Sequence, residues 1–244
     1  MNNFITNSEA ANLSRRLSEL ITKSEELKFL VGFFYFSGLR ELYIPLSKNP
    51  KVIIKVLAGL NVDKLNYELV EYADAEDRSG RLSNEDIQNK FLASLKKSIN
   101  TDKFDHKDFY EQVRFFVELI EQNRLIIRKT LKPNHSKLYI FKLQPEQVGR
   151  KSLFITGSSN LTGWGLNAQE EFNVEISDYG IDEAEGYFDS LWEEAVAITE
   201  NQKVREKLLE LIKRETLVRK ITPFEAYALV LKTYLDSFDK KEIG

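Results

Sequence analysis

Cysteine is absent from the 244-residue sequence, which also has one methionine and only two histidines, His106 and His135. Without cysteine there is no disulfide, no Cys-ligated zinc, no iron–sulfur cluster and no thiol nucleophile. Two histidines cannot supply a three-histidine metal site, and neither lies in an H-E-x-x-H pattern. Any catalysis must therefore depend on carboxylates, lysines, hydroxyls or one of two imidazoles.

Long apolar segments are also missing. No segment has a run of about 18 apolar residues, the minimum for a membrane-spanning helix. The N-terminal sequence MNNFITNSEAANL has neither the basic residues nor the apolar stretch of a signal peptide. We therefore expect no membrane association and a cytoplasmic location.

Charge is abundant but unevenly distributed. The net charge of −3 argues against a protein that coats nucleic acid over its whole surface. Residues 124–151 are nevertheless basic, whereas residues 168–200 are acidic and contain no Lys or Arg. The basic segment could bind an anionic ligand, or the two segments could attract each other across the fold. The basic residues of the first segment are Arg124, Arg128, Lys129, Lys132, Lys137, Lys142, Arg150 and Lys151.

The N-terminal part of the chain has the pattern of an α/β protein. Apolar spacing predicts a helix over 8–25 and another around 39–46, with buried strands over 27–38 and 51–60. The order strand, helix, strand favours a βαβ unit and therefore a parallel pair of strands.

The rest of the chain extends this architecture. A charged helical region at about 64–123 is expected to be an insertion between strands of one sheet. We predict a mixed sheet flanked by helices, in a domain of residues 1–199 that is followed by a helical extension or linker over 200–244. The remaining predicted elements are strands over 124–130, 135–141, 152–158 and 171–177, a helix over 181–198 and further helices from about 201.

Polar residues gather at the ends of two of these strands. His135 and Lys137 are two positions apart, so on a strand they project from the same face. Ser158 and Asn160, in the run Gly157-Ser158-Ser159-Asn160, follow the next predicted strand. If the strands are neighbours, an imidazole, an ammonium, an amide and a hydroxyl converge, which is a set suited to binding and attacking a phosphate. A carboxylate from the start of the following strand could orient the imidazole.

These residues carry a resemblance to a known family. HSK at 135–137, followed by GSSNLTGWGLNAQEEFNVEI at 157–176, resembles the phospholipase D superfamily, whose signature is H-x-K-x-x-x-x-D and then G-S-x-N. FLVGFFYFSGLRELYIPL and KVIIKVLAG are similar to the opening strand, helix and strand of such domains. The resemblance covers residues 25–60 and 124–199 and favours the nuclease or restriction-like branch. ITPFEAYALVLKTYL is similar to the segment that joins such a domain to a superfamily 2 helicase in bacterial proteins.

The resemblance implies a phosphodiesterase that uses no metal and no cofactor. His135 would attack phosphorus and form a phosphohistidine intermediate. Lys137 and Asn160, with Ser158, would bind the non-bridging phosphate oxygens. Glu171, rather than Glu170, matches the acid of the family and would orient His135.

Two features depart from the family pattern. The family aspartate would fall at position 142, where this chain has Lys142. The separation of Lys137 from Gly157 is longer than usual, which predicts an extended loop at KLQPEQVGRK. Nuclease-like branches tolerate loss of the aspartate, so the departure weakens the lipase and synthase interpretations more than the nuclease one.

The histidine count then bears on assembly. The family reaction needs a second histidine to protonate the leaving oxygen. His106 lies in FDHKDFYEQV, which has neither the H-x-K spacing nor a following G-S-x-N, so we interpret it as an ordinary surface residue. A twofold homodimer that brings two His135 side chains together would complete the site.

Three functions remain open. The first is a nuclease that cuts nucleic acid, DNA in preference to RNA, as part of a helicase-linked DNA-processing or defence system whose helicase lies in the full-length protein. The second is a catalytically inactive domain that binds nucleic acid, and the third is a module that dimerises a larger helicase. Lys129 and Lys132 are candidate nucleic-acid contacts, or else solvated loop charges.

Overall fold

The description concerns the following part of a computed structural model: residues 4–8, 12–34, 36–61, 82–99, 107–147, 149, 151–162, 165–166, 170–216, 227 and 231. His106 lies outside these residues, as does most of the predicted helical extension after residue 216.

The described strands form one eight-stranded sheet in the order β1-β7-β6-β5-β2-β3-β4-β8. Strands β2, β3 and β4 are parallel, and every other neighbouring pair is antiparallel. The predicted βαβ unit and the mixed sheet flanked by helices are both confirmed. The strands are β1 (Phe4–Ile5), β2 (Ser24–Val31), β3 (Ile53–Ala58), β4 (Leu125–Lys129), β5 (Leu138–Leu143), β6 (Ser152–Gly157), β7 (Asn173–Ile176) and β8 (Val196–Ala197).

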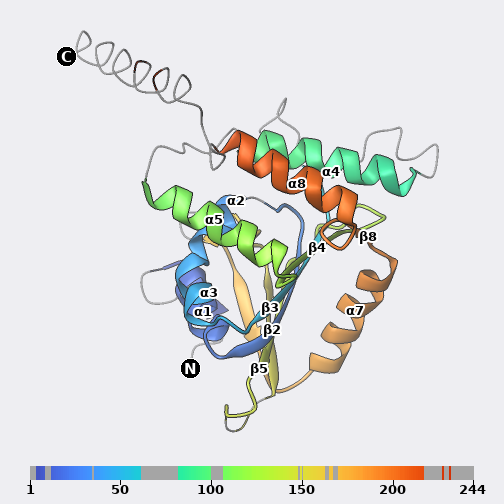
Figure 1. Cartoon of the computed structure of the whole chain (residues 1–244). Coiled ribbons are helices and arrows are strands. Elements are labelled where there is room, and N and C mark those ends of the chain that lie inside the picture. Colours follow the sequence, from blue (N-terminus) through green and yellow to red (C-terminus); the bar gives the residue numbers. More distant parts are fainter. Residues whose placement is uncertain are drawn as a thin grey trace.

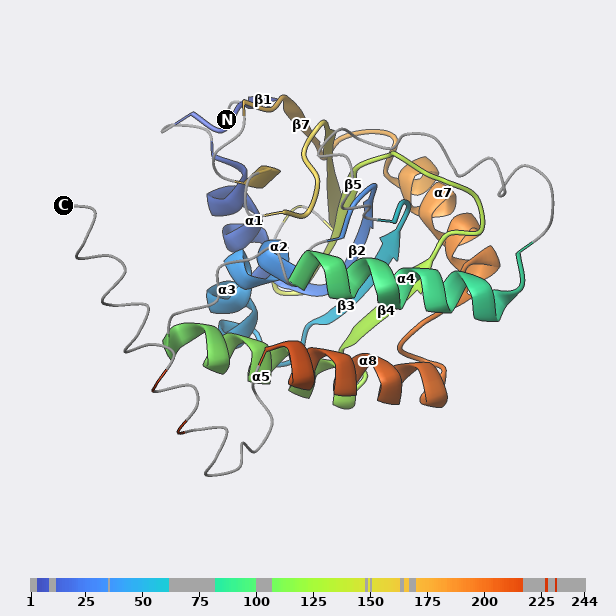
Figure 2. The same cartoon turned by 90° about the horizontal axis from the view of Figure 1, so that it is seen from above.

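Helices cover both faces of the sheet. Figures 1 and 2 show α7 by itself on one side and the other labelled helices on the opposite side. Among the described residues, none of the helices has the length and apolar character needed to cross a bilayer. The described helices are α1 (Leu13–Ile21), α2 (Phe36–Glu41), α3 (Tyr43–Lys48), α4 (Asn84–Ile99), α5 (Lys107–Glu121), α7 (Ile181–Glu194) and α8 (Gln202–Glu215).

The two faces follow from the alternation of side chains along the strands. On β2, Leu27, Phe29 and Val31 face the large core formed with α1, α4, α5 and α8, whereas Leu30 joins the smaller cluster under α7. The smaller cluster also contains Phe188 and Trp192 from α7 itself. The strands therefore hold one mainly aliphatic core and a second, thinner layer beneath a single helix.

Capping residues set the ends of two predicted helices. The side chain of Asn12 accepts a hydrogen bond from Arg15 N at 3.0 Å, so α1 begins after Asn12 and is shorter than predicted. At α4, Ser83 and Asp86 exchange hydrogen bonds as a capping box, so the helix begins after Ser83. Both hydrogen bonds from Ser83 lower the pKa of Asp86.

The central helices connect two neighbouring strands. Helices α4 and α5 lie in the sequence between β3 and β4, which pair in parallel. The predicted helical region is therefore inserted between two neighbouring strands of one sheet. Helix α8, the first helix after residue 200, packs on α4 and α5 and buries Leu208 and Ile212 in the large core. The predicted division between a domain and an extension at residue 200 stays a prediction.

The observed bounds of three elements differ from the predicted bounds. The strand predicted over 27–38 ends at Val31, because the chain leaves the sheet at Gly32 and α2 begins at Phe36. The strand predicted from His135 begins at Leu138. Helix α7 ends at Glu194, because the next residues form β8 and pair with β4.

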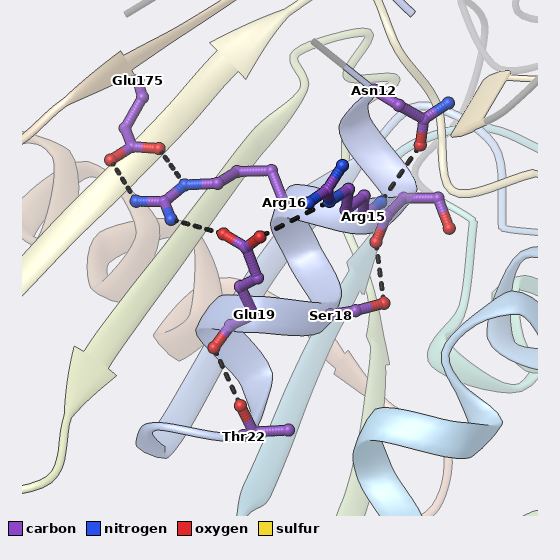
Figure 3. Close-up of polar contacts among 8 residues, drawn as sticks. Asn12, Arg15, Arg16, Ser18, Glu19, Thr22 and Glu175 are labelled. Atoms are coloured by element: carbon purple, nitrogen blue, oxygen red, sulfur yellow. Dashed lines mark hydrogen bonds and ion pairs between the residues drawn. The ribbon is translucent and has the colours of Figure 1, made fainter. Parts of the chain in front are cut away.

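Ion pairs from α1 and from β4 tie the acidic segment to the rest of the fold. Arg16 on α1 donates two hydrogen bonds to Glu175 on β7, at 2.6 and 2.7 Å, and a third to Glu19 (Figure 3). The bond to Glu175 is the main cause that raises the pKa of Arg16. Arg128 on β4 pairs with Glu200 at 2.5 Å, which joins the basic and acidic segments directly. Attraction between the basic and acidic segments thus accounts for Arg128.

Candidate active site

The candidate site lies where β2 and β6 end and β5 begins. Strands β5 and β6 are antiparallel, with Leu138 opposite Thr156, so the residues before β5 and after β6 meet at the same end. Thr156 Oγ1 donates to the carbonyl of Lys137 at 2.8 Å and fixes this junction. The convergence expected for the HSK and GSSN segments is therefore present.

His135 and Lys137 contact each other directly. The Nζ atom of Lys137 lies 3.0 Å from His135 Nδ1 and 2.9 Å from Nε2. Lys137 is 7% exposed, whereas His135 is an exposed residue. An ammonium has only donors, so at most one of the two ring nitrogens can accept from it. Although both residues precede the strand, they point the same way, as predicted.

Asn160 approaches His135 across a glycine. A Cβ built on Gly32, just after β2, would lie 3.1 Å from Asn160 Oδ1 and 3.1 Å from His135 Cδ2. Asn160 Oδ1 accepts a hydrogen bond from Phe33 N at 3.0 Å. Since the oxygen is held by the backbone, the amide group is oriented and its N–H groups can donate to an anion. The ring of Phe33 packs edge-on to the imidazole, with the centroids 6.3 Å apart.

Sequence reasoning missed the parts played by Gly32 and Phe33. The only local signal is a glycine within an apolar run, VGFFYF. Glycine in a strand often marks a close backbone or side-chain approach, but the sequence alone does not reveal which groups approach.

Ser158 and Glu171 form a second part of the site. The hydroxyl of Ser158 donates a short hydrogen bond to Glu171 Oε2 and accepts one from Phe172 N at 3.0 Å. The structure thus places Glu171, the acid predicted from the sequence, in hydrogen-bond contact with Ser158. Burial, with the nearby charge of Glu171, raises the pKa of Tyr139, whose hydroxyl donates to Ser159 O at 2.8 Å.

Asn173 holds the GSSN turn from β7. Its side chain is fully buried, accepts from Ser159 N at 3.3 Å and donates to Ser159 Oγ at 2.9 Å. A Cβ on Gly157 would lie 2.3 Å from Phe172 O, so glycine is needed for this close approach. Asn173 fixes the turn that carries Ser158 and Asn160, although nothing in the isolated sequence distinguished it.

The two candidate nucleic-acid contacts lie in different environments. Lys132 is exposed. Lys129 is 6% exposed, and its ammonium donates to Gly59 O at 2.9 Å and to Thr130 O at 3.3 Å. The interpretation of Lys129 as a surface residue that contacts a phosphate backbone is therefore wrong, because its ammonium is directed at backbone carbonyls inside the protein.

Lys142 lies at the opposite end of β5 from His135. Its side chain is half exposed and pairs with Glu25 at 3.5 Å. The position at which the family pattern has an aspartate is thus remote from the imidazole. Across the described part of the chain, no group of three His, Asp or Glu side chains could hold a metal ion.

Comparison with known proteins agrees with the motif. Residues 80–192 match the family model described as "Cardiolipin synthase, PLD-like domain". The chain contains a stretch of PLD-like sequence. This stretch includes His135, Lys137, Ser158, Asn160 and Glu171, so every residue of the candidate catalytic set falls inside it. None of the curated proteins matches the chain.

Three solved structures are similar to the chain at 12% identity each. A phospholipase D family member, Nuc from Salmonella typhimurium, has a TM-score of 0.39 and aligns over 79% of this chain and 93% of its own. NucT from Helicobacter pylori has a TM-score of 0.37, with 75% and 89% coverage. Phosphatidylserine synthase from Haemophilus influenzae Rd KW20 has a TM-score of 0.47, with 90% and 46% coverage. The chemistry of the site therefore has to be argued from its own side chains.

Proposed function

We propose that this protein is a metal-independent phosphodiesterase that cuts nucleic acid, DNA in preference to RNA, with His135 as the nucleophile. The observation that carries the proposal is the cluster of imidazole, ammonium and amide over Gly32. The lysine lies within 3.0 Å of the ring, and the asparagine faces the ring across the glycine. The match of residues 80–192 to a PLD-like domain supports the same reaction class.

The reaction has two displacement steps at phosphorus. In the first, a ring nitrogen of His135 attacks the phosphodiester, a phosphorus–nitrogen bond forms, and the bond to the leaving oxygen breaks as that oxygen takes up a proton. In the second, water attacks the phosphohistidine and releases the imidazole and a phosphomonoester. Lys137 and Asn160 would offset the charge on the non-bridging oxygens.

Ser158 and Glu171 would support these steps together. The carboxylate of Glu171 accepts from the Ser158 hydroxyl, and that hydroxyl also accepts from Phe172 N, so its orientation is fixed. We infer that Glu171 orients the site through this pair, with the alignment of His135 as the result.

Proton donation to the leaving oxygen requires a second acid, for which we propose His135 of a second copy in a homodimer. The exposure of His135 leaves room for such an approach. Because both rings would belong to one composite site, a dimer with one His135→Ala subunit should be inactive. Co-expressed mixtures then test the arrangement: activity should fall with the square of the wild-type fraction, whereas a linear fall would contradict a shared site.

The decisive assay measures hydrolysis of fluorogenic DNA and RNA oligonucleotides by the full chain in EDTA, with a phospholipid substrate in parallel. Activity should survive chelation, favour DNA, and fall by roughly 10³-fold or more in His135→Ala. Loss of activity on chelation, or an active His135→Ala protein with normal folding, would contradict the proposal.

Lys142 at the family aspartate position favours one alternative, a domain that binds nucleic acid without cutting it. The same samples distinguish it. Binding of the oligonucleotides without turnover by the wild-type chain would support that alternative.

A further inference from the structure

The loop that carries His135 is attached to the end of β3 at the carbonyl groups of Ala58 and Gly59. Ala58 O, at the end of β3, accepts from Thr130 N at 3.1 Å, and Gly59 O accepts from Lys129 Nζ at 2.9 Å and from Asn134 N at 3.2 Å. Thr130 Oγ1 lies 3.3 Å from Gly59 O. Two donors therefore meet at Gly59 O, and one of them is the backbone of the residue immediately before His135.

The contact at this carbonyl is close enough to require glycine. A Cβ on Gly59 would lie only 1.8 Å from Asn134 O, so the loop backbone rests directly on the end of β3. Thr130 Oγ1 donates to Lys132 O at 2.8 Å, which fixes the start of the same loop. Hydrogen bonds to the end of β3 therefore hold the segment from Thr130 to Asn134 at both of its ends.

The outer side of the loop is held by Asn134 itself. Its Oδ1 accepts from Ser136 N at 2.8 Å, and its Nδ2 donates to the hydroxyl of Tyr187 on α7 at 3.2 Å. Tyr187 is 46% exposed, whereas Lys129 is 6% exposed. The inner attachment through Lys129 is thus shielded from water and is the stronger restraint of the two.

A buried ammonium is an unusual choice for a purely structural contact. Removing a charge from water is costly in free energy, and an apolar side chain of similar size is often as stabilising. Lys129 nevertheless shares one face of β4 with the apolar residues Leu125 and Ile127, where an aliphatic side chain would fit the pattern. What the ammonium adds is a directional hold on Gly59 O.

We propose that Lys129 is a positioning residue that sets the His135 loop, so that the imidazole faces Lys137 and Asn160. The inference rests on the proposed function for its catalytic consequence, but the geometry of the loop can be measured without any activity. The role is distinct from the surface contact with nucleic acid predicted from the sequence.

The test compares Lys129→Met with Lys132→Met, which removes an exposed lysine from the same loop. Because the chain has only two histidines, histidine-selective ¹³C labelling gives two ring signals, and a His106→Gln background leaves that of His135. Lys129→Met should displace the His135 signal and change its response to added inorganic phosphate. Lys132→Met should leave the position of the His135 signal in the free protein unchanged.

Kinetics in EDTA provide the second measurement. Lys129→Met should lower kcat about 10- to 100-fold with KM changed less than about threefold, since a misplaced nucleophile slows chemistry more than binding. If Lys129→Met does not fold, Thr130→Val removes the hydroxyl from the same carbonyl, and a smaller displacement of the His135 signal is expected.

Two results separate this inference from the proposed function. An undisplaced His135 signal and unchanged kcat in folded Lys129→Met protein, or in Thr130→Val where the first variant does not fold, would overturn the positioning role. A displaced His135 signal in a chain that cuts no phosphodiester would support the loop inference and overturn the proposed function.

Discussion

The two ends of the β5–β6 hairpin differ sharply, although the family motif runs from one end to the other. At the end beside the C-terminus of β2, His135 and Lys137 are in contact, Asn160 is held by Phe33, and the GSSN turn is fixed by buried Asn173. At the far end, Lys142 forms one half-exposed ion pair with Glu25. Lys142 is five positions after Lys137, a distance of about 16 Å along an extended chain.

This difference explains how the chain can depart from the motif and keep a complete cluster. Position 142, where the family pattern has an aspartate, lies at the far end, where an exposed ion pair contributes little to stability. The groups that would bind and attack a phosphate lie at the end where polar side chains are ordered by several partners. We therefore expect large effects from substitutions at the first end and small ones at the second.

Removal of the Lys137 ammonium beside the imidazole should give the largest difference in activity between substitutions at the two ends. In Lys137→Met, kcat/KM for an oligonucleotide in EDTA should fall about 10²- to 10³-fold, because a preorganised donor to the phosphate is lost. Lys142→Met, on the strand that follows Lys137, is the matched control and should stay within about twofold. Equal losses in both variants would remove the distinction between the two ends.

A single methyl group at the end of β2 should separate His135 from Asn160. Gly32→Ala introduces a Cβ at 3.1 Å from each of them, which forces one side chain to move by a few tenths of an ångström. We expect kcat to fall about 10-fold with a loss of stability of about 1 kcal/mol. Unchanged kcat, with a melting temperature close to that of the wild type, would show that the approach over Gly32 is not important.

Loss of the buried Asn173 side chain should lower the stability of the protein more than a substitution of Lys142 at the far end of the hairpin. Asn173→Ala leaves the backbone and hydroxyl of Ser159 without their side-chain partner, at a cost of about 1–3 kcal/mol. Urea denaturation measures this cost. A change below about 0.5 kcal/mol would mean that the turn is held without Asn173.

Restoration of the family residue should have the smallest effect. Lys142→Asp gives the H-x-K-x-x-x-x-D pattern but exchanges one exposed ion pair for repulsion from Glu25. Stability should change by less than about 1 kcal/mol and the cleavage rate by less than about threefold. A tenfold gain in rate would mean that the far end of the hairpin contributes to catalysis.

Much of the fold could be predicted, because hydrophobic alternation and turn residues act locally. The parallel βαβ unit, the positions of β3 to β7 and the capping box at Ser83 all follow from nearby residues. The strand predicted over 27–38 extended too far because buried strands and buried helices are equally apolar, so VGFFYF did not mark the exit from the sheet.

The site could be predicted only in part. His135, Lys137, Ser158 and Asn160 stand in recognisable order, and the antiparallel hairpin brings their segments together. Gly32, which lies more than a hundred residues earlier, matters only through what it touches in the fold. The error at Lys129 was avoidable, since the alternation of β4 places it on the buried face with Ile127.

The covalent intermediate tests the central claim most directly. A single-turnover reaction with labelled oligonucleotide in EDTA, stopped at alkaline pH and digested for mass spectrometry, should place a phosphoryl–nucleotide adduct on the peptide that contains His135. The adduct should be absent from His135→Ala and retained in Lys142→Asp. Turnover that continues in His135→Ala, or label carried by another residue, would contradict His135 as the nucleophile.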